Sequence, residues 1–368
     1  MFLSLPRTAT ALAVGLVVAL TTAAAPASAG GAAWRDISPP ESDGAVLFDV
    51  ETAGGATWAV GLRNDATPRF FAPVAMRWTG TGWEAPAQPV ERARLDDLAV
   101  GAPDQVWAVG SQEEEGGHAR ALLQHWDGSA WSEAVLPFPD GADGTSLSAV
   151  DVDADGSVWV IGGYADAAGQ YVPVLFRGDG GGDWSVLPAD TGLGWVSQLE
   201  VGPGGVVHAI GDGISRFDGT SWTEQRVPRA LKDALFDGIE VAAPDDIWAV
   251  GHVRDETLWR RPVVLHFDGQ AWRTVRTPAE TGQLFDVTFD RGGRPLIVGE
   301  SMDPEVSPSG NYVLKLNKRG VLTRVAALPG AGFLYGAATD EAGRIWVAGG
   351  TSGAEGGISP SAYAGIRD

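Results

Sequence analysis

The six residues DVDADG, at positions 151–156, form the sharpest metal-binding pattern in the chain. Asp151, Asp153 and Asp155 are followed by Gly156, which matches the first half of a calcium loop, where alternate carboxylates turn inward around a hard cation. The twelfth position of such a loop carries a bidentate acid, but here it is Gly162. The pattern therefore makes these three aspartates candidate calcium ligands, with ordinary turn chemistry as the alternative.

A second group of polar side chains stands between apolar residues that are spaced three apart, as Asp49 stands between Leu47 and Val50. The members are Asp49, Asp96, Asp97, Gln198, Asp237 and Asp286. If the pairs belong to equivalent strands, these carboxylates converge and repel one another, which raises some of their pKa values or recruits a cation. We expect Asp49, Asp97, Asp237 and Asp286 to bind a divalent ion, with calcium as first choice, or a cationic or hydroxyl-rich ligand. The alternative is that each aspartate caps its own turn.

Other catalytic patterns are missing from the sequence. It has no cysteine, no H-E-x-x-H zinc motif, no G-x-S-x-G and no P-loop. His125 and His266 occupy equivalent positions in QHWDG and LHFDG, which favours a structural role, and His208 stands where tryptophan stands elsewhere. His118 and His252 lie in expected loops without paired spacing, so a zinc site is not expected.

Internal repeats indicate which elements must position these residues. The tetrad WAVG begins at 58, 107 and 248, and WVIG at 159, HAIG at 208, LIVG at 296 and WVAG at 346 complete a series of seven. Each tetrad follows one apolar pair. Most of the tetrads are followed by a strand, a glycine turn and a second strand that opens with tryptophan, as in QHWDGSAW. Each unit therefore holds four short strands.

Seven units of four antiparallel strands predict an all-β fold, a seven-bladed β-propeller. The last unit ends without its fourth strand, and the segment AAWRDIS at 32–38 supplies it, so we expect the N-terminal strand to close the last blade. In a propeller the first strand of each blade is the innermost, and all of these strands begin on the same face. We therefore expect the acids that stand between the apolar pairs to gather at one mouth of the central channel. The expected single domain is 30–368, with blades at about 45–89, 94–138, 146–189, 195–229, 235–279, 283–329 and 333–368 plus 32–38.

The repeat motifs resemble those of known propellers. DADGSVWVIGG and DEAGRIWVAGG resemble the D-x-x-G-x-h-W repeats of bacterial secreted and sensor propellers, and the HWDGSAW turns are similar to kelch and galactose-oxidase-like blades. The resemblance covers essentially all of the mature chain and implies the fold, but no one function, because propellers include lyases, oxidases, lectins and scaffolds. Kelch-type copper oxidases use a cysteine crosslinked to a tyrosine, which this cysteine-free chain excludes.

The first 29 residues have the pattern of a secretory signal peptide. Arg7 is the only charge before Arg35, the apolar run is short for a membrane span, and ASA at 27–29 is a small-residue cleavage site. We expect cleavage after Ala29 and an extracellular protein without membrane insertion; an uncleaved anchor is the alternative. Losing Arg7 moves the formal charge from −21 to −22, which argues against nucleic acid or anionic lipid as partner.

Loop lengths indicate the working face. Within each blade, the expected loops between the second and third strands are long and dissimilar, whereas the other turns are short. Binding residues tend to lie on long, variable loops, so we expect the face of the ring that carries these loops to bind ligand. The polar and aromatic residues of this face are Phe70, Phe71, Tyr164, Tyr171, Trp195, Trp259, Arg260 and Arg261. Of these, we expect Trp195 and Trp259 to contact ligand.

The sequence favours a monomeric, non-enzymatic binding module for a glycan, peptide or cell-surface component. No cofactor is required, although calcium is a candidate. The alternative is a secreted lyase or hydrolase, because paired carboxylates at the channel mouth with divergent pKa values can do acid and base work. A third class, a structural envelope protein, would show no pocket.

Overall fold

Twenty-eight strands and one three-residue helix make up the regular structure of the described residues, in a computed structural model. Because η1 (Arg229–Leu231) is the sole helix among them, this part of the chain has no helical membrane span. The expected signal peptide lies outside the described residues. These are 33–39, 43–64, 71–114, 119–187, 189–254, 260–278, 281–302, 310–325, 328, 330–351 and 362–367.

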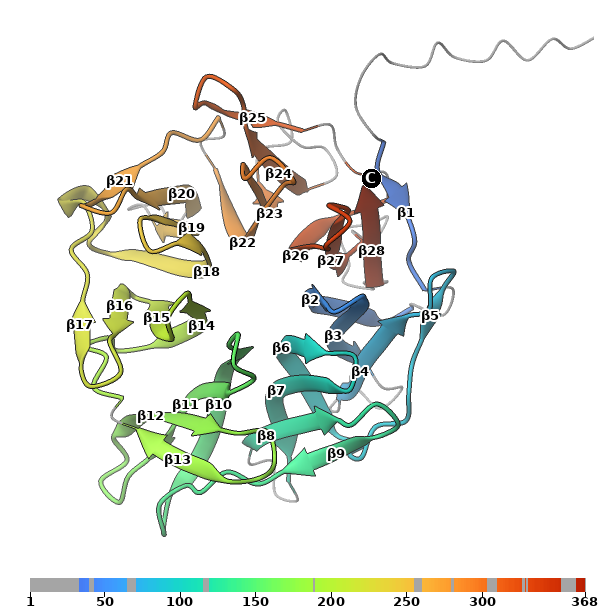
Figure 1. Ribbon diagram of the computed structural model, residues 1–368, viewed down its shortest axis with the longest axis vertical. Helices are drawn as coiled ribbons and strands as arrows, with labels where there is room; N and C mark the ends of the chain where they lie inside the picture. The colour runs from blue at the N-terminus through green and yellow to red at the C-terminus, as the bar shows by residue number, and fades with distance from the viewer. Residues whose placement is uncertain are drawn as a thin grey trace, which may run out of the picture. The chain divides into compact units, whose positions relative to one another are not determined.

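The strands form seven antiparallel sheets of four, arranged in a ring, which confirms the predicted fold (Figure 1). Blade 1 contains β2 (Ala45–Ala53), β3 (Ala56–Asn64), β4 (Phe71–Trp78) and β5 (Trp83–Glu84). Blade 2 contains β6 (Ala93–Ala102), β7 (Gln105–Glu113), β8 (Ala119–Trp126) and β9 (Trp131–Ala134). Blade 3 contains β10 (Asp143–Val152), β11 (Val158–Ala165), β12 (Tyr171–Gly178) and β13 (Trp184–Leu187).

The remaining blades follow the same order from the channel outward. Blade 4 contains β14 (Val196–Gly202), β15 (Val206–Gly211), β16 (Ile214–Phe217) and β17 (Trp222–Glu224). Blade 5 contains β18 (Ala234–Ala243), β19 (Asp246–Arg254), β20 (Arg260–Phe267) and β21 (Trp272–Thr274). Blade 6 contains β22 (Gly282–Phe289), β23 (Pro295–Ser301), β24 (Asn311–Leu316) and β25 (Leu322–Arg324). Blade 7 contains β26 (Phe333–Thr339), β27 (Ile345–Gly350), β28 (Ala362–Arg367) and β1 (Arg35–Asp36).

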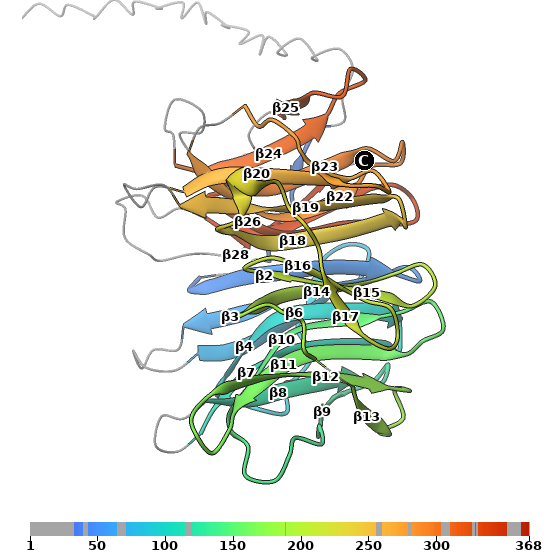
Figure 2. The ribbon, with the colours of Figure 1, turned by 90° about the vertical axis from the view of Figure 1, so that its left-hand side faces the viewer.

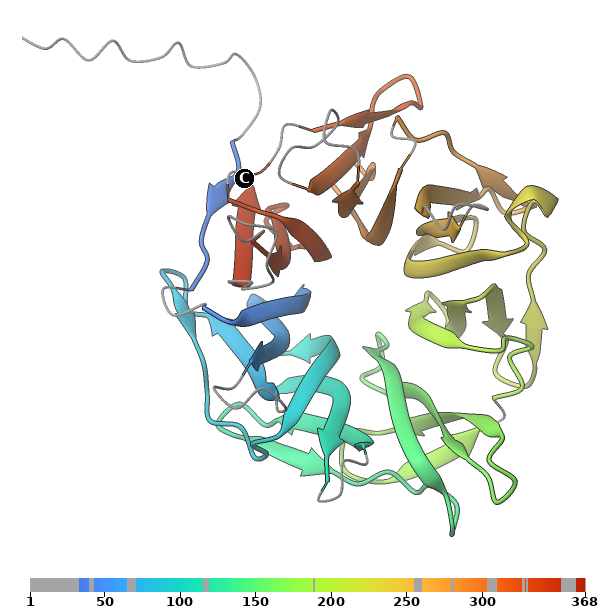
Figure 3. The ribbon, with the colours of Figure 1, turned by 180° about the vertical axis from the view of Figure 1, so that it is seen from behind.

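The N-terminal strand closes the ring as predicted. β1 pairs with β28, and Ile37 N–H donates to the Ala364 carbonyl at 2.9 Å (Figures 1 and 3). The Ile37 carbonyl in turn accepts from the Trp83 indole of blade 1 at 2.9 Å. The β1 segment therefore joins blade 7 to blade 1.

A bulge in every inner strand explains the glycine of each tetrad. The pairing register shifts directly after Leu47 in β2, and equivalent shifts occur in the other six inner strands. Gly61 lies opposite this bulge, where a Cβ would overlap the Val46 carbonyl oxygen. The other six tetrad glycines meet inner-strand carbonyl oxygens in the same way. The bulge therefore requires glycine at this position.

Hydrophobic packing lies between blades as well as within them. Seven buried clusters occur, one at each interface between neighbouring blades. Five tetrads place a tryptophan there that is at most 4 % exposed, namely Trp58, Trp107, Trp159, Trp248 and Trp346. The strands run from one face of the ring to the other (Figure 2). Each interface between neighbouring blades contains the first residue of one tetrad.

Deletion of residues 30–39 should destabilise the mature protein. Full burial of an indole contributes about 4 to 6 kcal/mol, from about 150 to 250 Å² at about 25 cal/mol/Å². Trp34 is half-buried and contributes about half of that, and each lost backbone hydrogen bond adds about 0.5 to 1.5 kcal/mol. Denaturant unfolding should show a loss of at least about 3 kcal/mol, and a truncated protein as stable as residues 30–368 would contradict the role of β1.

Candidate functional site

The bulged residues of the inner strands surround one mouth of the channel. Each blade contributes one such side chain, and all seven line a cavity of about 290 Å³. They are Phe48, Asp96, Ser148, Ser197, Asp237, Phe285 and Tyr335. Asp49, Arg94, Asp97, Gln198 and Asp286 complete the lining. The structure therefore brings four predicted site residues, Asp49, Asp97, Asp237 and Asp286, to one cavity.

The cavity rim is divided into two arcs of different chemistry. Blades 6, 7 and 1 supply Phe285, Tyr335 and Phe48, whose rings touch in series: the Tyr335 centroid lies 4.6 Å from Phe285 and 5.5 Å from Phe48. Blades 2 to 5 supply Asp96, Ser148, Ser197 and Asp237. A ligand at this mouth thus meets an aromatic wall on one side and hydrogen-bond acceptors on the other.

The aspartates one residue further along act as clamps between blades. Asp49 accepts from Val50 N–H on its own strand at 2.8 Å and from Leu98 N–H of blade 2 at 3.0 Å. Asp286 likewise accepts from Val287 N–H at 2.7 Å and from Ala337 N–H of blade 7 at 2.8 Å. These hydrogen bonds join neighbouring inner strands rather than capping a single turn.

Asp97 makes a longer-range version of this clamp. Its two oxygens accept from Val150 N–H of blade 3 at 2.8 Å and from the Gln198 amide of blade 4 at 2.9 Å. Replacing such an aspartate with asparagine removes one of two acceptors. We therefore do not expect asparagine at Asp49, Asp97 or Asp286 to leave stability unchanged.

A deeper layer of acids extends the cluster down the channel. Glu51, Asp151, Glu200 and Glu240 lie two residues beyond the clamp position of their strands. Burial raises the pKa of Glu240 to about 8, with Asp151 as a further cause. Burial also raises the pKa of Glu51 and Glu200 well above the usual range, and the neighbouring channel carboxylates raise both further. These groups from four blades thus repel one another across the channel.

The pKa values of the clamp aspartates Asp49, Asp97 and Asp286 are also raised. Burial raises the pKa of Asp49 to about 6, although its two backbone hydrogen bonds act in the opposite direction. Burial raises the pKa of Asp97 and Asp286 well above the usual range, and repulsion by Asp49 adds to both shifts. A hydrogen-bond donor or a cation at the mouth would relieve this repulsion.

Asp237 belongs to a separate polar network between blades 5 and 6. Its Oδ2 lies 3.0 Å from the Gln283 amide nitrogen, which donates to it, and 3.2 Å from His252 Nδ1. The Gln283 carbonyl oxygen accepts from Arg260, whose guanidinium is 3.7 Å from Glu300. Asp237 is therefore held in place by side chains that themselves do not line the cavity.

The three aspartates of the calcium pattern separate in space. Asp151 lies in the channel and accepts from Val152 N–H at 2.6 Å and Val201 N–H at 2.7 Å. Asp153 accepts from Ser157 N–H at 3.0 Å and the Trp159 indole at 2.9 Å. Asp155 accepts from the Ser157 hydroxyl at 2.6 Å, so turn chemistry accounts for the latter two.

Within the described ranges, no three His, Asp or Glu side chains are grouped so as to hold a metal ion. Calcium binding stays a prediction.

Of the two tryptophans predicted to bind ligand, the one that the structure describes does not line the mouth. Trp195 directly precedes β14, is 46 % exposed and does not line the cavity. Trp259, like Phe70, lies outside the described residues. Among the other loop aromatics, Phe71 and Tyr171 are exposed, whereas Tyr164 packs edge-on against Phe138.

Sequence reasoning did not identify several residues of this site. Three of these residues are glutamates two positions after the clamp position of their strands, namely Glu51, Glu200 and Glu240. Because side chains alternate along a strand, residues two apart point to the same side, and this spacing was the signal that could have identified them. The aromatic arc had no such signal, because Phe48, Phe285 and Tyr335 reach the mouth only through the bulges.

Stability should rise as the pH falls from about 8 to about 5. The folded state favours protonated channel acids, so it binds more protons than the unfolded chain, and the free energy of unfolding falls as pH rises through this range. Glu240→Gln removes one charge and should raise stability at pH 8 while weakening the pH dependence. Thermal unfolding against pH checks this, with exposed Glu224→Gln as control.

The opposite trend should appear only in stronger acid. Hydrogen bonds, from Ser129 and Arg273 foremost, lower the pKa of Asp127 and Asp268 to about 2, so their contribution is lost below about pH 4. A protein that became steadily more stable from pH 5 to pH 8 would contradict the repulsion in the channel.

Asp97→Asn should destabilise the protein by about 1 to 3 kcal/mol, because the amide leaves one of two buried donors without an acceptor. The neighbouring Asp96→Asn is the matched control: Asp96 forms a partly exposed ion pair with Arg94, which typically contributes about 0 to 1 kcal/mol. Denaturant unfolding of both variants measures the difference. Equal losses would show that Asp97 is not a clamp.

Comparisons with known proteins confirm the fold and go no further. No protein-family model matches the chain, and no curated protein matches its sequence. A streptogramin B lyase structure has 10 % identity and a TM-score of 0.62, covering 92 % of this chain and 98 % of that one. YCF48 from Cyanidioschyzon merolae has 17 % identity and a TM-score of 0.60, covering 91 % and 99 %. The WD40 β-propeller domain of Doa1 has 11 % identity and a TM-score of 0.59, covering 91 % and 97 %. At such identities the shared feature is the seven-bladed propeller, and neither a kelch type nor the D-x-x-G repeat class is established.

Proposed function

We propose that this chain is a secreted binding module that recognises a cationic or hydroxyl-rich group of an extracellular glycan or peptide at the channel mouth. The observation that carries the proposal is the divided lining of the cavity, with aromatic rings from three consecutive blades facing carboxylates and hydroxyls from the other four. Secretion rests on the N-terminal sequence pattern alone.

The two arcs suit one kind of ligand. The rings of Phe285 and Tyr335 can stack on a sugar ring or attract an ammonium group, whereas the Arg94 guanidinium already lies over the Phe48 ring, 5.7 Å from its centroid. Asp96, Asp237, Ser148 and Ser197 offer acceptors to the hydroxyl or amine hydrogens on the other side of the ligand. A donor bound above the buried acids would also lessen their mutual repulsion.

A cavity of this size and polarity favours a binding role over a purely structural one. Arg94 is the single Lys or Arg of the lining, and its guanidinium donates to Asp96 at 2.7 Å. The cation at the mouth is thus already paired with Asp96, so it does not neutralise Asp237 or the clamp acids. No cofactor is required, and calcium at the mouth remains a prediction.

A lyase or hydrolase is the second candidate, because Asp237 and His252 form a pair of the kind that general bases use. Burial also raises the pKa of Glu300 nearby. However, His252 is only 3 % exposed, and its Nε2 is buried with no hydrogen-bond partner in the described part of the chain. A substrate in the cavity would not reach this nitrogen, so the geometry supports binding better than catalysis.

Phe285→Ala should lose ligand binding without losing the fold. We expect screening against glycan, cationic-peptide and polyamine arrays to yield a ligand, and affinity for it to fall at least about tenfold in this variant. The half-buried ring lies on the cavity rim, so the melting temperature should change little. Trp195→Ala, an exposed aromatic outside the cavity, is the matched control and should bind as the wild type does.

The result that contradicts the mouth as binding site is equally specific. If Trp195→Ala abolished binding while Phe285→Ala retained it, the loops rather than the mouth would hold the ligand. Turnover of a bound polysaccharide or peptide that Asp237→Asn abolishes would favour the enzymatic alternative.

A further inference from the structure

A second cavity lies at the place where blade 4 departs from the repeat. Five of the seven tetrads begin with a buried tryptophan at a blade interface, but the tetrad of β15 begins with His208. Imidazole is smaller than indole, so the interface between blades 4 and 5 is left unfilled at this position. A cavity of about 380 Å³ occupies it.

The preceding interface shows what the complete arrangement looks like. The Arg177 guanidinium of β12 lies 4.9 Å from the ring centroid of Trp159 and 3.4 Å from the Asp155 carboxylate. In blade 5, His266 stacks on Trp248 at 4.4 Å and lies 2.8 Å from Asp246. Each cation or imidazole on the third strand thus has both an aromatic surface and an acid.

Blade 4 supplies neither of these partners at the equivalent positions. Arg216 pairs with His208 across β15 and β16, but the turn before β15 is Gly202–Gly205 and contains no acid. On β17, Thr223 faces Arg216, where blade 1 has Glu84 facing Arg77. In the described ranges Arg216 forms no ion pair. Nearby Asp218 accepts through Oδ1 from Ser221 and Thr220 N–H at 2.9 Å, and these hydrogen bonds, with the charge of Arg216 as a further cause, lower the pKa of this carboxyl.

His208 itself also lacks a partner. The side chain is 5 % exposed, and its Nδ1 is buried without a hydrogen bond to any described residue. Burial, with Arg216 as a second cause, lowers the pKa of His208 to about 4. A neutral imidazole therefore borders the cavity next to an exposed guanidinium that forms no ion pair in the described ranges.

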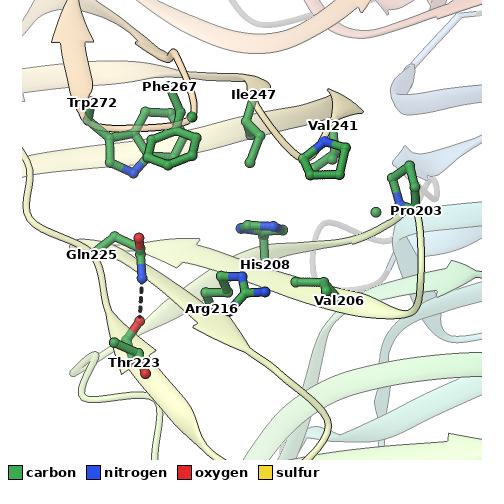
Figure 4. A pocket seen from close by; sticks show the side chains of 13 residues that line it. Pro203, Val206, His208, Arg216, Thr223, Gln225, Val241, Ile247, Phe267 and Trp272 are labelled. Carbon is green, nitrogen blue, oxygen red and sulfur yellow. Dashed lines mark hydrogen bonds between the residues drawn. The ribbon is translucent and has the colours of Figure 1, made fainter.

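The opposite wall of the cavity is apolar and comes from blade 5. Figure 4 shows Phe267, Trp272, Ile247 and Val241 facing His208 and Arg216 across the cavity. Thr223 and Gln225 continue the polar wall, and the Gln225 amide donates to the Thr223 carbonyl at 3.0 Å. The cavity is bordered by turns Gly202–Gly205 and Gly269, at the ring face opposite the mouth.

We propose that this cavity binds a small organic anion with an aromatic or similarly flat apolar body. Arg216 pairs with its carboxylate or sulfonate, His208 forms part of the cavity wall, and Phe267 and Trp272 cover the apolar body. The volume is within the range of small-ligand sites, which are about 300 to 1,000 Å³. Because the cavity and the mouth lie on opposite faces, this proposal does not depend on the proposed function.

The experiment uses 2-naphthalenesulfonate, 3-phenylpropanoate and benzoate as probes, each beside its neutral amide, with calorimetry and ligand-observed NMR on the mature protein. We expect at least one anion to bind at least about tenfold more tightly than its amide. Arg216→Gln should abolish this difference. Exposed Arg229→Gln is the matched control and should retain it.

His208→Trp supplies the second arm, because it restores the residue that the repeat uses elsewhere. This variant should fold with a melting temperature at or above that of the wild type and should lose probe binding. Phe285→Ala at the mouth should bind the probes normally. The proposal is overturned if no anion binds better than its amide, or if His208→Trp or Arg216→Gln binds the anion as the wild type does.

Discussion

The inner edge of each blade presents backbone N–H groups to the channel, and these donors need acceptors that no further strand supplies. Buried backbone donors are almost always paired, so this requirement is strict. In blades 1, 2, 3 and 6 the acceptors are the channel carboxylates of Asp49, Asp97, Asp151 and Asp286, each of which reaches into the next blade. Where glycine stands instead, the next inner strand comes close: a Cβ at Gly336 would lie 2.8 Å from the Asp49 Cα.

The use of carboxylates as acceptors for the inner-strand N–H groups has an electrostatic cost. Carboxylates are strong acceptors for backbone donors, yet several of them in one narrow channel repel one another and lose hydration. Burial raises the pKa of Asp49 and of Asp151 to about 6, even though each accepts two backbone hydrogen bonds. A clamp built from acids therefore leaves a channel mouth that favours cations and hydroxyl donors, so that one set of residues serves both the fold and the proposed ligand.

The fold could be predicted from the sequence because its strongest signals are periodic. The glycine of every tetrad is fixed by the inner-strand bulge, and the tryptophans are fixed by the blade interfaces, so both recur at nearly constant intervals. The convergence of Asp49, Asp97, Asp237 and Asp286 on one cavity followed from the same repeat. Their individual roles did not, because a linear pattern does not show that Asp97 reaches Val150 while Asp237 holds His252.

The two proposed sites differ in how they relate to the repeat. At the mouth, the bulged side chains line the cavity, and their identity varies from Phe48 to Asp96 to Ser148. At position 208 the side chain is part of the packing, and replacing tryptophan there leaves a void beside a buried imidazole nitrogen without a partner. Voids and unpaired buried polar groups both cost stability. A ligand that fills the void and pairs with Arg216 would recover part of that stability, which gives blade 4 a physical reason to depart from the repeat.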